Sequence, residues 1–361
     1  MQPLPGNSRL PVLFVSPCAF DSIRQRHHAF AELFSENGFP TLFINPLKTS
    51  GFSISIAKIN KMNILSIRVP FKAAQFPGIN AIAVKIALTM VKNSGVSKNS
   101  VLWIGDPAFS SATDWKWSSI VYDRCDLHGF FPGQIKSAWR KHESAIYKRA
   151  DVIFATTELI KKDSENNGAK NVVLLPNAVH SSWVKEKRTS FPMFPPLRII
   201  SAGAHFEWID FKWLEMFTNN PKISLNIVGP GRGCDFSRLI NLPGVTYHGI
   251  VGHDKLRQIV DSCHVGLIPF KKMKLTLAVD PIKAYEYKAR GLLIWSSDIP
   301  ELFHHPFVDR VVEDSDELKK AIKEYEFNRS YNLSEPGMTG KIILPTWEER
   351  FREVLGQVEI K

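Results

Sequence analysis

A lysine and a glutamate stand three residues apart in the run DPIKAYEYKARG at 280–291, where a helix is expected to begin. Asp280 is a favourable N-cap residue and Pro281 a favourable first helical residue. The open amides of a helix start attract phosphate, and Lys283 would add a full positive charge. Glu286 lies on the same helical face, where its carboxylate can accept hydrogen bonds from a ribose diol. The spacing therefore fits a diphosphate site followed by a ribose site, and it fits an ordinary Lys–Glu surface pair equally well.

A second group of polar residues follows the apolar stretch SIVY at 119–122. Asp123, Asp126 and His128 stand there, and ligands of open α/β sheets bind beyond the carboxyl ends of strands. Such a group can supply a general base. The two aspartates can instead cap the helix that follows them.

These residues need elements to position them, and the chain is long enough to form two domains. It has 361 residues, 44% of them hydrophobic and 22% charged, which is the composition of a globular protein. Apolar runs of strand length alternate with amphipathic helical patterns, and this alternation predicts α/β units with parallel sheets. The strands are expected at 11–16, 41–45, 63–69, 100–105, 119–123, 151–156, 171–176, 197–203, 223–229, 244–249, 263–270 and 291–297.

The alternation of strand and helix patterns is interrupted at 185–196, where KEKRTSFPMFPP combines charges with three prolines. We therefore expect two Rossmann-like domains, at 1–185 and 197–340, joined by a linker at 186–196. The apolar spacing of PTWEERFREVLGQVEIK predicts a helix within 341–361. The site is expected in the cleft between the domains.

Charge is unevenly distributed along the chain. Residues 1–185 hold 22 Lys and Arg against 12 Asp and Glu, whereas residues 186–361 hold 24 against 23. Such an excess suits a nucleic acid, an anionic lipid surface or an anionic substrate. The first half contains no helix-turn-helix pattern, zinc-finger spacing or RNP-like strand, so nucleic acid is not an expected partner.

One segment of the basic half could meet a membrane from the side. The stretch 71–92 places apolar residues beside lysines, as expected for an interfacial helix on anionic lipid or for a core helix with a basic outer face. The residues concerned are Phe71, Phe76, Ile79, Ile82, Ile86 and Met90 with Lys72, Lys85 and Lys92. No stretch reaches the length of a membrane span, and MQPLPGNSRL does not read as a signal peptide. We expect a cytoplasmic protein that can also lie on the inner face of the membrane.

Four cysteines stand far apart, with no CxxC pair and no histidine at ligand spacing, so reduced thiols are expected rather than disulfides or zinc. Glycines in the second half follow strands, as at Gly203, Gly229 and Gly249, where backbone could approach a ligand or simply turn. The run GPGRGC at 229–234 does not fit the GxGxxG dinucleotide fingerprint, and this disfavours a dehydrogenase.

The segment DPIKAYEYKARGLLIWSSDIPEL at 280–302 resembles the donor-binding segment of bacterial GT-B glycosyltransferases that assemble capsule, exopolysaccharide, teichuronic acid or O-antigen. Further segments resemble the same family in order along nearly the whole chain. They lie at 23–46, 119–130, 141–162, 172–180 and 244–270.

The resemblance implies roles for individual residues. Lys283 and Glu286 match the diphosphate and ribose positions, and Asp126 matches the second acid of a YDxxD segment, which makes it the first choice for the base, with His128 as the alternative. Arg24 or Arg26 would contact phosphate or acceptor, because SPCAFDSIRQR lacks the family's Gly-rich loop. The implied contacts to the donor nucleotide are Gly203, Gly229, His248, Gly249, Ile250, Asp280, Pro281, Ile282, Lys283 and Glu286.

The sequence also departs from the family. Ala278 stands where many retaining members carry a second acid, eight positions before the ribose-binding glutamate, so one contact to the donor sugar is missing. No DxD motif supports a metal, since the one in EDSDE at 313–317 lies in a charged loop or helix start. We expect no cofactor and no metal, because Lys283 and the helix start can stabilise the leaving diphosphate.

The resemblance thus implies a metal-independent glycosyltransferase that uses a nucleoside-diphosphate sugar. Its acceptor would be a lipid-linked or growing bacterial surface glycan. The resemblance also implies that the domain at 1–185 binds the acceptor, that the domain at 197–340 binds the nucleotide, and that the helix within 341–361 packs back on the first domain. Two alternatives stay open: a nucleotide-sugar epimerase of the same architecture, and an inactive subunit that binds a partner through the basic half.

Overall fold

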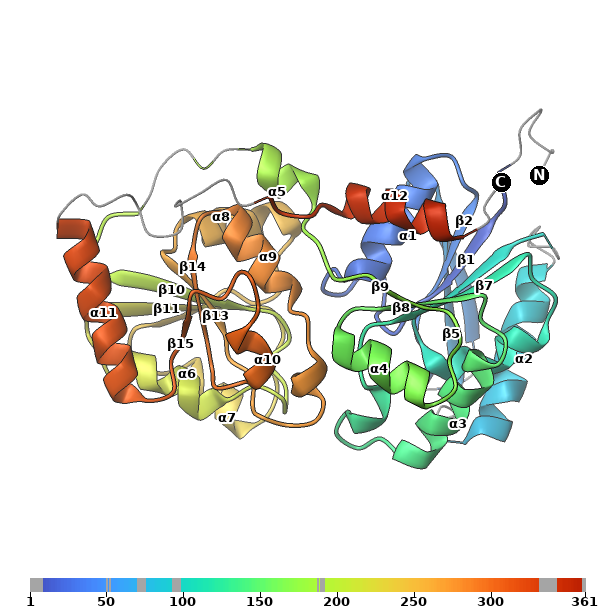
Figure 1. Ribbon diagram of the computed structural model, residues 1–361, viewed down its shortest axis with the longest axis horizontal. Helices are drawn as coiled ribbons and strands as arrows, with labels where there is room; N and C mark the ends of the chain where they lie inside the picture. Colours follow the sequence, from blue (N-terminus) through green and yellow to red (C-terminus); the bar gives the residue numbers. More distant parts are fainter. Residues whose placement is uncertain are drawn as a thin grey trace. The chain divides into compact units, whose positions relative to one another are not determined.

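The computed structural model describes residues 9–49, 51, 53–69, 76–92, 99–186, 188, 192–330 and 343–358. The chain divides into two compact units, one made of Met1–Pro176 with Trp347–Lys361 and the other of Asn177–Thr346. Each unit is built on its own sheet (Figure 1). The expected α/β class with parallel sheets is confirmed.

The sheet of the first unit has nine strands in the order β3-β5-β2-β1-β6-β7-β8-β9, with β4 paired to β5. All neighbours are parallel except β4 and β5. The strands are β1 (Val12–Val15), β2 (Thr41–Ile44), β3 (Lys48–Thr49), β4 (Ser53–Ile59), β5 (Met62–Val69), β6 (Val101–Ile104), β7 (Ser119–Arg124), β8 (Val152–Ala155) and β9 (Val172–Leu174).

The β4–β5 hairpin was not anticipated from the sequence. Ile59 pairs with Met62 across its turn, and Asn60 takes a φ of 52°. Asparagine tolerates this left-handed conformation better than most residues, which makes it a usual hairpin residue.

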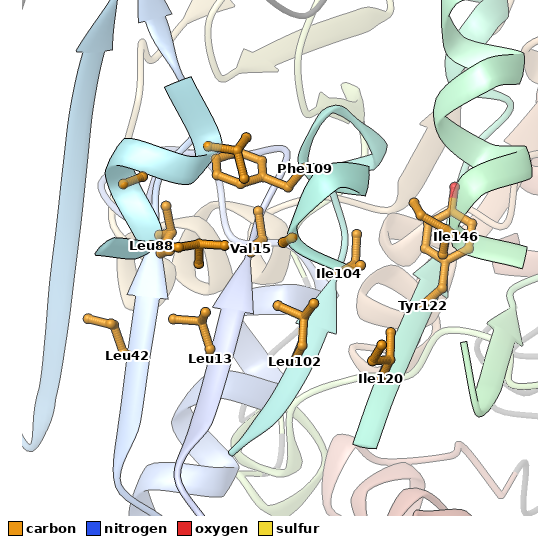
Figure 2. Close-up of a cluster of buried hydrophobic side chains, with 14 of the residues drawn as sticks. Leu13, Val15, Leu42, Leu88, Leu102, Ile104, Phe109, Ile120, Tyr122 and Ile146 are labelled. Atoms are coloured by element: carbon orange, nitrogen blue, oxygen red, sulfur yellow. The ribbon is translucent and has the colours of Figure 1, made fainter. Parts of the chain in front are cut away.

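Helices cover both faces of this sheet. They are α1 (Arg26–Glu36), α2 (Pro77–Lys92), η2 (Pro107–Asp114), η3 (His128–Phe130), α3 (Lys136–Tyr147), α4 (Glu158–Asn166) and α12 (Trp347–Gln357), of which η2 and η3 are 3-10 helices. On one face, strand residues such as Leu13 and Leu102 pack against Leu88 of α2, Phe109 of η2 and Ile146 of α3 (Figure 2). Because strand side chains alternate between faces, Phe14 and Trp103 point to the other face.

An aromatic cluster on that second face ties the last helix to the first. Phe34 of α1 meets Phe351 of α12 with ring centroids 4.8 Å apart, and Phe30 meets Trp347 at 5.5 Å. The helix expected near the C-terminus is therefore α12, and it lies beside α1 in the first unit (Figure 1).

The sheet of the second unit has six parallel strands in the order β12-β11-β10-β13-β14-β15. This is the 3-2-1-4-5-6 order of a dinucleotide-binding fold, and the order reverses between β10 and β13. The strands are β10 (Leu197–Ala202), β11 (Ile223–Val228), β12 (Val245–Tyr247), β13 (Val265–Ile268), β14 (Leu293–Ser296) and β15 (Arg310–Val311).

Two hydrophobic clusters sandwich this sheet. On one face it packs against α6 (Phe211–Thr218), α7 (Cys234–Leu239) and α11 (Ser315–Ser330). On the other it packs against α5 (Ser181–Lys185), α8 (His253–Asp261), α9 (Ile282–Ala289) and α10 (Pro300–Phe303). A short 3-10 helix, η4 (Thr276–Ala278), precedes α9.

The observed division differs from the expected boundaries. The first unit ends at Pro176 rather than at 185, and α5 packs with α9 in the second unit. Arg188, in the middle of the expected linker, donates to the carbonyls of Asp261 at 2.7 Å and Cys263 at 2.8 Å. This part of the 186–196 segment therefore lies on the second unit and is not a free connection.

Candidate active site

The start of α9 differs in one respect from the sequence-based expectation. Pro281, not Asp280, is the N-cap residue, and it makes no side-chain capping bond. The carboxylate of Asp280 is engaged elsewhere, because it accepts hydrogen bonds from the backbone amide of Asn177 at 2.6 Å and from the Tyr285 hydroxyl at 3.0 Å. His305 Nε2 lies 3.3 Å from the same carboxylate.

Asp280 is consequently a structural residue. A buried carboxylate is costly unless it is hydrogen-bonded, and Asp280 is 9% exposed. The Asn177 side chain also donates to the Asp280 carbonyl at 2.6 Å. Asn177 thereby fixes the backbone that leads into α9, a role that the sequence alone did not reveal.

Lys283 and Glu286 meet as expected from their spacing. Lys283 Nζ lies 2.5 Å from Glu286 Oε2, and the two side chains are 16% and 8% exposed. Burial raises the pKa of Glu286, but the charges of Lys283 and His253 outweigh this and leave that pKa below its ordinary value. The carboxylate is thus ionised at neutral pH. The pair is largely buried, unlike the surface pair that was the alternative interpretation.

Three glycines converge at the carboxyl ends of neighbouring strands. The Gly229 amide after β11 donates to the Gly249 carbonyl after β12 at 2.7 Å. A Cβ on Gly229 would lie 2.1 Å from the carbonyl oxygen of Gly203 after β10, and Gly229 has a φ of 112°. Only glycine fits at this position. Sequence spacing had suggested the three glycines singly, and the structure brings them together.

The neighbouring predicted contacts lie on the same edge. His248 Nε2 is 2.9 Å from Asn226 Oδ1, so that its ring bonds to β11, and burial together with Lys255 lowers its pKa. Ile250 is 68% exposed and presents an apolar surface beside the glycines. In a parallel sheet the helices that follow strands begin at this edge, so α9 after β13 begins there too.

In the first unit, the strand end after β7 contains two aspartates in different surroundings. Asp123 is fully buried and pairs with Arg26, whose Nη2 lies 2.9 Å from Oδ1 and whose Nε donates to Oδ2 at 3.1 Å. Arg26 also donates to the Leu175 carbonyl at 2.9 Å. Arg26 was predicted to contact phosphate or acceptor, but its buried guanidinium is committed to Asp123. Arg24 instead pairs with Glu32 and is partly exposed.

Asp126 is half-buried, and burial raises its pKa to about 6, with Arg26 opposing the rise. A carboxylate with this pKa is ionised near neutral pH and still basic enough to accept a proton. His128 is buried against Trp139, with ring centroids 5.7 Å apart, and burial lowers its pKa to about 3. The environment therefore favours Asp126 over His128 as a base. The first residues of η3 receive no side-chain cap, so neither aspartate caps this helix.

A group of three side chains near Asp123 has the composition of a metal site. The ligand atoms of His27, Asp123 and Cys125 lie within 4.8 Å of one another. The Arg26 guanidinium already neutralises Asp123, and burial raises the pKa of the Cys125 thiol well above its ordinary value. A protonated thiol is a poor metal ligand. Cys18, Cys125, Cys234 and Cys263 are all free thiols.

Comparison with solved structures identifies the fold. The sucrose-phosphate synthase of Thermosynechococcus elongatus superposes with a TM-score of 0.66 at 14% identity, covering 96% of this chain and 94% of that chain. The α,α-trehalose 6-phosphate synthase of Burkholderia multivorans superposes with a TM-score of 0.62 at 11% identity, covering 97% and 98%. The chain has the GT-B fold.

The chain is also similar in sequence to a known protein. The putative teichuronic acid biosynthesis glycosyltransferase TuaH of Bacillus subtilis is 24% identical over 243 residues. The match covers 59% of this GT-B chain and 59% of that protein. No family model matches the chain. Within the described residues, no helix has the length and hydropathy needed to cross a membrane.

Proposed function

We propose that the protein is a glycosyltransferase that moves a sugar from a nucleoside-diphosphate donor to a lipid-linked or growing bacterial surface glycan. The observation that carries this proposal is the buried Lys283–Glu286 pair at the start of α9. In the same unit, the strand ends of the sheet bring Gly203, Gly229 and Gly249 together. The GT-B fold and the similarity to TuaH support the same reaction.

In this proposal the second unit binds the donor. Lys283 turns from Glu286 to the diphosphate, and the uncapped amides at the start of α9 contribute further positive potential. The glutamate released from Lys283 accepts hydrogen bonds from the ribose. The glycine backbone and the exposed face of Ile250 contact the nucleoside.

The first unit supplies the base. The acceptor hydroxyl gives its proton to Asp126 as its oxygen bonds to the anomeric carbon of the donor sugar. The bond from that carbon to the phosphate oxygen breaks, and the nucleoside diphosphate leaves with the electron pair. Lys283 and the helix start stabilise the charge that develops on the diphosphate, so no metal is required.

The chain is also proposed to act at the inner face of the cytoplasmic membrane, through the outer face of α2. Ala83, Val84, Ala87 and Leu88 of this helix are buried in the core. Phe76, which precedes the helix, is exposed, as are Ile79, Ile82 and Ile86 on its outer side, where Ile82 reaches 62% exposure beside the exposed Lys85. Phe71 and Lys72 lie outside the described residues. A helix that is apolar on both sides next to lysine suits an anionic lipid surface.

Assays of donor turnover with and without acceptor test the proposal. A glycosyltransferase consumes a nucleotide sugar such as UDP-glucose or GDP-mannose far faster when a lipid-linked glycan is added. Release of free nucleotide at an acceptor-independent rate would support an epimerase of this fold instead. Nucleotide binding without any turnover would indicate an inactive binding subunit.

A further inference from the structure

Asp106 is a buried carboxylate that neither the sequence motifs nor the proposed mechanism uses. It follows the last residue of β6 by two positions and is 8% exposed. As the N-cap residue of η2, it accepts a hydrogen bond from the Ala108 amide at 2.9 Å through Oδ1. Among the described residues, nothing donates a hydrogen bond to Oδ2, and no cationic side chain pairs with the carboxylate. One oxygen of Asp106 can therefore accept a hydrogen bond from a ligand.

The other buried carboxylates described in the first unit have cationic partners. Asp123 pairs with Arg26. Glu143 pairs with Arg124. Asp106 differs from both, because burial raises its pKa to about 6 and only a backbone amide opposes the rise. A buried carboxylate is costly without partners, and groups in such surroundings are concentrated at functional sites.

The position of Asp106 in the sheet is the one at which ligands are expected. The strand order of the first unit reverses between β1 and β6, and open α/β sheets bind ligands beyond the carboxyl ends of the strands at such a reversal. Asp106 follows β6, and the start of α1 packs at the same edge, since a Cβ on Gly105 would lie 2.3 Å from His27 Nε2. Burial lowers the pKa of His27 to about 4, so this ring is neutral and brings no positive charge to Asp106.

Asp106 shares this edge of the sheet with Asp126, the proposed base. The neighbouring strands β6 and β7 pair Ile104 with Tyr122, so the two aspartates follow this pair by two and four residues. Cys18, which follows β1, reports on both of them. Burial and then the charges of Asp126 and Asp106 raise the pKa of the Cys18 thiol to about 12, so both carboxylates lie close enough to act on the same sulfur.

We propose that Asp106 binds the terminal sugar of the acceptor, and that its carboxylate accepts a hydrogen bond from a hydroxyl next to the one that Asp126 deprotonates. A neutral sugar supplies such hydroxyl groups as donors. A uronic acid or a phosphate would instead place a further negative charge beside two carboxylates, which is unfavourable. The substrate class is therefore a glycan that ends in a neutral sugar. The inference rests on the proposed function, since it requires a glycan acceptor and Asp126 as the base.

The experiment measures initial rates of transfer from UDP-glucose or GDP-mannose over a range of acceptor concentrations. The acceptors are polyprenyl diphosphates that carry glucose, galactose or N-acetylglucosamine, and a matched one that carries glucuronic acid. The wild type should use the glucuronic acid acceptor with a kcat/KM roughly tenfold or more below that of the best neutral acceptor. Asp106→Asn keeps a side chain suited to the N-cap but removes the charge. Its acceptor KM should rise about 5-fold to 10-fold, the difference between hydrogen bonds to charged and to neutral groups, with kcat and donor KM unchanged.

Asp210→Asn is the matched control, because Asp210 is the N-cap residue of α6 in the second unit and accepts from the Trp213 amide at 3.0 Å. It should leave the acceptor KM unchanged. An unchanged acceptor KM in Asp106→Asn would reduce Asp106 to a cap of η2 and overturn the inference alone. Equal use of the glucuronic acid acceptor by the wild type would do the same, and this comparison does not depend on the folding of any variant. Donor turnover that none of the acceptors accelerates would overturn the proposed function and this inference with it.

Discussion

Lys283→Ala separates the two contributions of the Lys283–Glu286 pair, to ligand binding and to folding. The lysine is the proposed partner of the diphosphate, and a charge-assisted hydrogen bond of this kind contributes about 1.5 to 3 kcal/mol. We therefore expect affinity for a nucleoside diphosphate to fall by about 10-fold to 150-fold in titration calorimetry. Glu286→Ala should in addition weaken the binding of a nucleoside that carries no phosphate.

The same substitution leaves a buried carboxylate without its counter-charge. Glu286 is 8% exposed and Lys283 16%, so loss of the pair should cost about 1 to 3 kcal/mol of folding free energy, somewhat less than for a fully buried pair. Because the pKa of Glu286 is lowered in the folded protein, its stabilising contribution is present above the ordinary glutamate pKa and is lost as pH falls through the lowered value. The melting difference between wild type and Lys283→Ala should accordingly shrink in acid.

The double variant Lys283→Ala/Glu286→Ala is the control for folding, because it removes the unpaired carboxylate. It should recover part of the stability that Lys283→Ala loses and none of the diphosphate affinity. Undiminished diphosphate affinity in Lys283→Ala would refute the assignment and return the pair to a structural role.

Further predictions concern the base, metals and the membrane. Asp126→Asn should lower the rate of transfer by about 10²-fold to 10⁴-fold with donor binding unchanged. Because Asp126 must be ionised, wild-type transfer should fall as pH drops below about 6. Near-normal activity of Asp126→Asn together with loss of activity in His128→Ala would identify His128 as the base. Asp123→Asn should lower the melting temperature, since it removes the counter-charge of the buried Arg26, with activity per folded molecule retained. Transfer should survive dialysis against EDTA, and restoration of lost activity by a divalent cation would contradict a metal-independent reaction. The wild type should sediment with anionic liposomes at low salt, and Ile82→Asp should sediment less. Ile343→Asp, which changes an exposed isoleucine of the second unit, is the control and should sediment like the wild type. Equal binding to neutral and anionic vesicles would exclude the interfacial role.

Local patterns predicted most of the elements because their causes are local. The run PVLFVS became β1, and DVIFAT became β8, since a buried parallel strand needs an unbroken apolar run. The spacing of Lys283 and Glu286 likewise placed them on one face, as a helix requires.

The errors came from partners distant in sequence. Asp280 is a residue type that favours the N-cap position, but its carboxylate accepts a hydrogen bond from the backbone amide of Asn177, 103 residues away. Arg24 or Arg26 was expected to contact phosphate or acceptor, and of the two the structure pairs Arg26 with Asp123, 97 residues away. A single sequence shows which side chains can form hydrogen bonds or ion pairs, but it does not show which distant residue will be the partner in the folded protein. The β4–β5 hairpin was missed for another reason, because its turn depends on one asparagine at positive φ.

The two aspartates after β7 show how burial can separate the roles of identical side chains. Both follow the same strand, and only the resemblance to a YDxxD segment distinguishes Asp126 in the sequence. Asp123 meets the Arg26 guanidinium at 2.9 Å and is fully buried, so its charge is compensated and no acceptor hydroxyl can reach it. Asp126 lies three residues further on and is half-buried, and desolvation raises its pKa to about 6 while Arg26 only partly opposes the rise. Arg26 thus pairs with Asp123 in a structural role and leaves Asp126 basic enough to accept a proton. A general base beside a buried ion pair requires this difference between the two carboxylates.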